Sequence, residues 1–122
     1  MAVTYTVAVK NARLSAVVSQ IGSTGVLEIG TAGMASILAT ITLNATAGTA
    51  ATGVLTFSGF PKSDTADATG IAAAARIRTA SGGTDIVTGL TVGTSGTDIV
   101  LDSVNITTGQ TVTINSASIT HA

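Results

Sequence analysis

The residues of this chain that could do chemistry are few, and their spacing does not form a catalytic site. The single histidine, His121, is the second-last residue of the sequence, and a chain end is a poor place for a general base. Serine and threonine are abundant, but the sequence contains no Gly-x-Ser-x-Gly motif, which would expose a serine as a nucleophile. We therefore expect no enzymatic activity and no catalytic residue.

Three aspartates, Asp85, Asp98 and Asp102, resemble ion ligands only weakly. Gly83–Val87 reads Gly-Thr-Asp-Ile-Val and recurs as Gly96–Val100, whereas calcium-binding repeats need a nine-residue period over several copies. We favour turn aspartates that accept backbone N–H groups, and ion binding by these three stays an open alternative. With no cysteine and no phosphate-binding glycine motif, we expect neither a metal nor a cofactor.

The low charge of the chain excludes other classes of partner. Charged residues make up 9% of the sequence and the formal net charge is -1. Its cations are Lys10, Arg13, Lys62, Arg76 and Arg78. They are too few and too scattered to neutralise a run of phosphates, so we expect no nucleic-acid partner. The longest apolar stretch, Ile71 to Ala75, is far too short to cross a bilayer, so we expect no membrane span.

The first 22 residues predict an extended segment followed by a short helix. Residues 1–10 alternate, with Val3, Tyr5, Val7 and Val9 on one parity, as in an edge strand or a free arm. Helical spacing then begins. Its apolar positions are Leu14, Val17, Val18 and Ile21, with Asn11 as the N-cap and Gly22 as the end of the helix.

The following residues mostly indicate strands. Leu27 and Ile29 flank Glu28 in the first of them, and the next runs from Ile37 to Leu43. Residues 45–53 indicate an irregular connection, Val54 to Phe57 a strand, and Lys62 to Asp67 a polar loop.

The second half of the chain adds further strands. Ile71 to Arg78 is ambiguous because four alanines favour helix, but we prefer strand because Arg76 and Arg78 share one parity. The two Gly-Thr-Asp-Ile-Val segments predict successive strands of a meander. In the last strand the apolar parity changes, which predicts a β-bulge near Asn115 and Ser116.

About seven or eight short strands separated by glycine-rich turns are typical of a β-sandwich or a jelly-roll-like fold. We expect residues 11–122 to form one such domain, with one short N-terminal helix that covers an edge or an open end. Much of the apolar content is alanine, which buries little area, so we also expect self-association as a dimer or trimer.

Two groups of residues are candidates for a partner interface. Val3, Tyr5, Val7 and Val9 form either a first core strand or an arm that adds to the sheet of a neighbour. Arg76 and Arg78 project to the same side of their strand, where they either bind carboxylates of a partner or keep an exposed strand soluble.

The order of features along the chain resembles a family of small virion structural proteins that tailed bacteriophages encode beside the major capsid protein. The resemblance is carried by Asn11 to Leu14, Gly25 to Ile29, Leu38 to Leu43, Asp67 to Gly70, Ala75 to Ile77, Val92 to Ser103 and Gly109 to Ile114. It covers nearly the whole chain. Ala75 stands where an aromatic residue is expected in the family.

The resemblance implies a capsid cement, or decoration, protein. Such a protein is made in the host cytoplasm, binds the outside of the phage head, contacts the major capsid protein and stabilises the contacts between capsomers. Two alternatives stay open: a tail or head-to-tail component of the virion, and a bacterial surface adhesin or pilus-like subunit.

Overall fold

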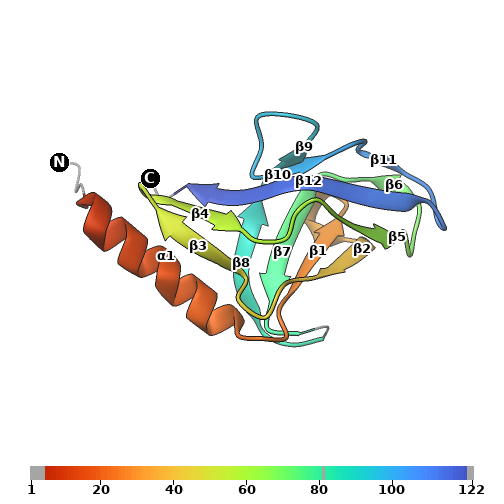
Figure 1. Ribbon diagram of the computed structural model, residues 1–122. Helices are drawn as coiled ribbons and strands as arrows, with labels where there is room; N and C mark the ends of the chain where they lie inside the picture. Colours follow the sequence, from red (N-terminus) through yellow and green to blue (C-terminus); the bar gives the residue numbers. More distant parts are fainter. Residues whose placement is uncertain (1–4, 81, 121–122) are drawn as a thin grey trace.

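The computed structural model describes residues 5–80 and 82–120, and it is mainly β with one long helix (Figure 1). In chain order the elements are α1 Val7–Ile21, β1 Val26–Gly30, the 3-10 turn η1 Ala32–Met34, β2 Ile37–Thr42, β3 Gly48–Ala51, β4 Val54–Phe57, β5 Lys62–Thr65, β6 Gly70–Ile71, β7 Ala74–Arg78, β8 Asp85–Leu90, β9 Val92–Gly93, β10 Ile99–Leu101, β11 Asn105–Ile106 and β12 Thr111–Thr120. The predicted class, mainly β with one N-terminal helix, is confirmed. A jelly-roll connectivity stays a prediction.

Two sheets make up most of the fold. The first has the strand order β2-β1-β7-β8, and the second has the order β3-β4-β12-β10-β9 with β5 also paired to β12. The strand β12 is ten residues long, and it pairs with β5 through its first half and with β4 through its last residues. A separate two-stranded ribbon, β6 with β11, lies at the end of the molecule far from α1 (Figure 1).

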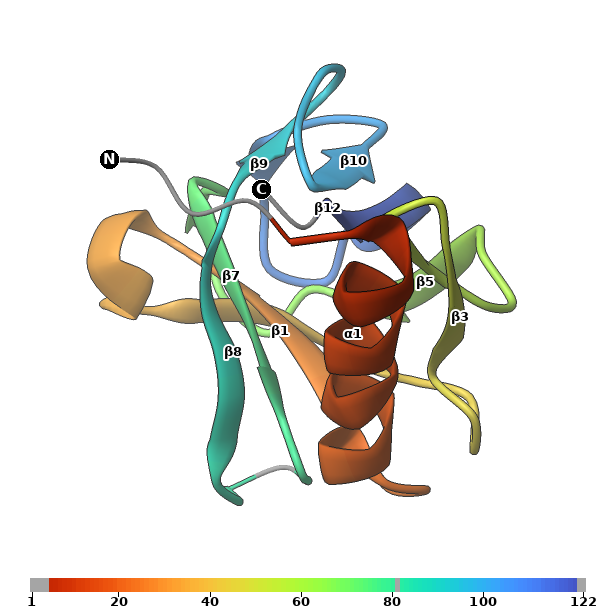
Figure 2. The same cartoon turned by 90° about the vertical axis from the view of Figure 1, so that its left-hand side faces the viewer.

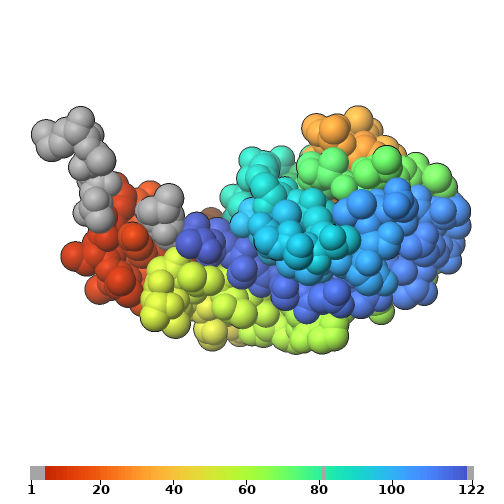
Figure 3. Space-filling view, turned by 90° about the horizontal axis from the view of Figure 1, so that it is seen from above, coloured from red at the N-terminus to blue at the C-terminus, as the bar shows by residue number. Residues whose placement is uncertain are grey.

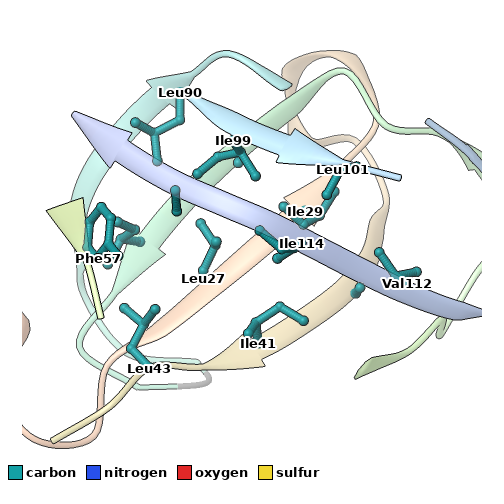
Figure 4. Packing of buried hydrophobic residues seen from close by; sticks show 14 of the residues in the cluster. Leu27, Ile29, Ile41, Leu43, Phe57, Leu90, Ile99, Leu101, Val112 and Ile114 are labelled. Atoms are coloured by element: carbon teal, nitrogen blue, oxygen red, sulfur yellow. The ribbon is translucent and has the colours of Figure 1, made fainter. Parts of the chain in front are cut away.

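The hydrophobic core lies between the inner faces of the two sheets. Figure 4 shows Leu27 and Ile29 of β1 pointing toward Ile99, Leu101 and Ile114 of the second sheet. Each of these five side chains is at most 1% exposed. Alternate residues of β1, β4 and β7 face this core, and this is why the period of two in the sequence located these strands.

The helix α1 lies along the open side of the sandwich, between β8 and β3 (Figure 2), and it also contacts β4. It buries only Leu14 and Ile21, while Val17 and Val18 are half-buried against the core. Gly22 ends the helix as predicted, with φ of 73° and its N–H donated to the Val18 carbonyl. The prediction that the helix covers an edge or an open end is confirmed, since α1 contacts the edge strands β3 and β8.

The prediction of an extended segment over residues 1–10 is wrong for residues 7–10. The helix begins at Val7, because the Thr6 hydroxyl accepts the Val9 N–H and caps the first turn. Val7 also stands seven residues before Leu14, a helical spacing that competes with the alternation. Residues 1–4, which include Val3, lie outside the described residues. Asn11 is inside the helix and does not cap it.

Three further predictions need correction. β3 forms in the supposed connection, where Gly48 lies so close to β4 that a Cβ would collide with the Thr56 carbonyl oxygen. β5 forms in the supposed polar loop, because its backbone pairs with β12. The two Gly-Thr-Asp segments lead into β8 and β10, which belong to different sheets and are not neighbours in a meander.

The predicted bulge is confirmed. Val100 faces Ser116 while Leu101 faces Ile114, so Asn115 has no partner residue on β10.

Candidate interaction surfaces

Arg76 and Arg78 project from the outer face of the first sheet, where they meet two carboxylates of the same chain. Antiparallel pairing of β1 with β7 places Glu28 directly opposite Arg76. The Arg76 Nε donates to the Glu28 Oε1 over 2.6 Å. The Arg78 Nε lies 2.9 Å from the Asp85 Oδ1, and the Arg78 Nη2 donates to the Gly83 carbonyl over 2.6 Å. We call Glu28, Arg76, Arg78 and Asp85 the sheet ion network.

The sheet ion network is electrically neutral and partly shielded from water. Glu28 is 5% exposed and is the only buried polar or charged residue of the described chain. Its hydrogen bond to Arg76 raises the pKa of that guanidinium above its ordinary value. The arginines share one face as predicted, but both are already paired within the chain. Glu28 was not predicted as an interface residue, although its position between Leu27 and Ile29 placed it on the outer face.

The first turn of α1 and the residue before its cap form an exposed apolar surface. Tyr5, Val7 and Val9 are 42%, 53% and 42% exposed, and they are three of the four large hydrophobic residues that the described chain exposes. The Arg13 guanidinium lies over the Tyr5 ring at 4.6 Å, which is a cation–π contact. Lys10 lies on the same helix, three residues before Arg13 and about one turn away from it. We call Tyr5, Val7, Val9, Lys10 and Arg13 the helix tip.

The helix tip differs from the sheet ion network in its charge. Neither Lys10 nor Arg13 forms an ion pair within residues 5–80 and 82–120. Three of the four predicted N-terminal interface residues are exposed around the start of α1 and not on a strand. Val7 and Val9 lie in the first turn on different sides of the helix, and Tyr5 precedes the cap. The two cations of the helix tip were not predicted as interface residues, although their spacing of three residues is the signal that would have placed them near one another on a helix.

A polar cleft of about 220 Å³ separates β2 from β5. It is lined by Thr40, Ile41, Thr42, Lys62, Ser63 and Asp64. Its charged groups are engaged within the chain, because the Asp64 carboxylate accepts the Thr40 N–H and the Lys62 ammonium donates to the Asn44 amide oxygen.

The three candidate aspartates do not come together to form one ion-binding site. Asp85 belongs to the sheet ion network, so it is not a turn aspartate. Asp98 is one, since its Oδ2 accepts the Thr91 N–H over 3.1 Å. Asp102 is exposed in the loop between β10 and β11. Within the described residues no three His, Cys, Asp or Glu side chains are grouped so that they could hold a metal. His121 lies outside these residues.

Comparison with protein-family models, with curated proteins and with solved structures finds no match. None of the helices in the described part of the chain is long and apolar enough to cross a membrane.

Proposed function

We propose that this protein is a non-enzymatic virion structural protein, a capsid cement protein that binds the outside of a phage head. The observation that carries the proposal is the helix tip, where three apolar side chains are exposed around the start of α1 and where Arg13, over the Tyr5 ring, and Lys10 have no ion-pair partner in the described chain. Such a mixture of aromatic, aliphatic and arginine side chains is typical of the residues that dominate protein interfaces. The family resemblance supplies the partner, the major capsid protein.

The architecture suits a role in which the chain resists deformation. Its core is continuous between the two sheets, and α1 is fixed to the sandwich by Leu14 and Ile21. Force from a partner bound at the helix tip is therefore transmitted to a packed domain. Many copies that each bridge a capsomer boundary stabilise a shell kinetically, because rupture of the shell requires all of these contacts to break.

The experiment compares phage particles that carry the protein with particles stripped of it. Complete particles are expected to contain many copies on the head and to release DNA at a higher temperature than stripped particles. Equal release temperatures for complete and stripped particles would contradict the cement role. A few copies located at the tail or neck would instead favour the alternative of a tail component.

A pair of matched variants tests the surface itself. Val7→Thr with Val9→Thr keeps the shape of both side chains but adds hydroxyl groups, so rebinding to stripped particles is expected to weaken by about tenfold or more. Ala16→Ser, on the exposed part of the same helix beyond the tip, is the control and is expected to rebind normally. Equal rebinding of both variants would show that the helix tip is not the binding surface.

A further inference from the structure

The eleven charged side chains divide into a paired group and an unpaired group. The sheet ion network takes four of them, and Lys62 and Asp64 share the cleft between β2 and β5. Asp98 is held by the Thr91 N–H. The side chains that remain without an ion pair or a hydrogen bond to a polar group of the described chain are Lys10, Arg13, Asp67 and Asp102. Two are cations on α1 and two are exposed carboxylates in loops.

The exposed large hydrophobic residues divide in the same way. Three of the four belong to the helix tip, and the fourth is Ile71 of β6, which is 61% exposed. β6 pairs with β11 antiparallel through Ile71 and Asn105, so the loop that contains Asp67 enters one end of this ribbon and the loop that contains Asp102 enters the other. We call Asp67, Ile71 and Asp102 the ribbon tip.

The two tips lie at opposite ends of the molecule. α1 projects at one end, and the ribbon of β6 and β11 with its entering loops forms the other (Figure 1). The view from above agrees, with the helix at one extreme and the segments around residues 66–71 and 102–106 toward the other (Figure 3). One end is therefore apolar and basic, and the opposite end is apolar and acidic.

We propose that copies of this chain associate head to tail, with the helix tip of one copy docked on the ribbon tip of the next. Such a contact covers apolar side chains on both partners and places Lys10 and Arg13 near Asp67 and Asp102, which complements their charges. A stable contact of this kind needs about 800 Å² from each partner. Because the two surfaces differ, repetition of the contact gives a closed ring, of which a trimer is the smallest, or an open row. A two-fold dimer is not expected.

This inference goes beyond the proposed function, since head-to-tail association occurs in the isolated protein whether or not a capsid is its partner. Sedimentation of the purified chain at low salt tests it. The wild-type protein is expected to form species larger than a dimer at concentrations of up to about 1 mM, and to dissociate as salt shortens the Debye length from about 30 Å to about 3 Å. A wild-type protein that stays monomeric throughout would overturn the proposal.

Charge exchange identifies the surfaces. Lys10→Glu with Arg13→Glu makes both ends acidic, and Asp67→Lys with Asp102→Lys makes both ends basic. Each pair is expected to raise the dissociation constant by about tenfold or more. The chain with all four substitutions keeps the wild-type net charge of -1 and is expected to associate again, because the two ends are complementary once more.

Circular dichroism confirms that each charge variant is folded before it is sedimented. Association that survives either double substitution, or that the fourfold variant does not recover, would show that the two tips do not meet. A dimer that depends on Val7 and Val9 but not on Asp67 or Asp102 would instead point to a two-fold contact between helices and would also overturn the proposal. Both contacts use the helix tip, so the substitutions at Asp67 and Asp102 separate them. These two substitutions are expected to weaken self-association and to leave rebinding to stripped particles unchanged.

Discussion

Two pairs of basic side chains in this protein have opposite surroundings. Arg76 and Arg78 lie on a central strand, where Glu28 and Asp85 take up their charge. Lys10 and Arg13 lie on a helix that extends past the sheets, where no carboxylate of the described chain pairs with them. From the sequence alone, the arginine pair on the strand was one of two candidate partner sites, and Lys10 and Arg13 were in neither. The structure indicates that neighbouring strands decide whether a basic pair can bind a partner. Strand pairing gave Arg76 and Arg78 carboxylates of the same chain and gave Lys10 and Arg13 none.

The substitution with the largest expected effect on stability breaks the sheet ion network. Glu28→Ala removes the buried carboxylate and leaves the Arg76 guanidinium without its 2.6 Å hydrogen bond. We expect a loss of about 3 kcal/mol in the free energy of unfolding, at the lower end for a broken buried ion pair because the arginines keep some contact with water. Urea denaturation measures it. Glu28→Gln keeps an acceptor and should lose less, and a loss below about 1 kcal/mol for Glu28→Ala would mean that the pair behaves as an exposed one.

An intermediate effect tests how the helix is attached to the sandwich. The Asn11 Oδ1 accepts the N–H of Gly53 in the turn between β3 and β4, over 2.9 Å. Asn11→Ala leaves that N–H without a protein partner and is expected to cost about 1 kcal/mol of stability. Asn11→Asp retains the acceptor and serves as the control in the same thermal denaturation. If both variants melt like the wild type, the apolar contacts of Leu14, Val17, Val18 and Ile21 hold the helix without this hydrogen bond.

The smallest effect on stability is expected at the helix tip. Arg13→Ala removes only the exposed contact with the Tyr5 ring, so we expect a loss of about 0.5 kcal/mol in the free energy of unfolding. Arg13→Lys keeps the charge and should change stability even less. A loss above about 2 kcal/mol would show that Arg13 supports the fold as Arg76 does, and the contrast between the two basic pairs would then disappear.

Local patterns in the sequence were enough for much of the fold. Alternation located β1, β2, β4 and β7, Gly22 marked the end of α1, and the change of parity before Ala117 located the bulge in β12. In each case neighbouring residues carry the information, since side-chain period and turn chemistry are local properties.

What the sequence did not yield depends on pairing between distant segments. β3 and β5 contain small or polar residues, and they are strands because β4 and β12 offer backbone partners. The partner of Arg76 is Glu28, 48 residues away, and no local pattern links the two. At the start of α1 two local signals competed: alternation favoured a strand, whereas the Thr6 cap and the seven-residue spacing to Leu14 favoured the helix that forms.

The strand β12 also has a consequence for the order in which the fold is completed. It follows β4, β5 and β10 in the chain, yet it is the neighbour with which all three pair. As the ribosome makes the chain, the first sheet has all of its strands by Leu90, whereas the second sheet lacks its central strand until the residues after Gln110 have emerged. Pairings between segments so far apart form slowly. The nascent chain therefore keeps the backbone edges of β4 and β10 that face β12 unpaired until β12 arrives.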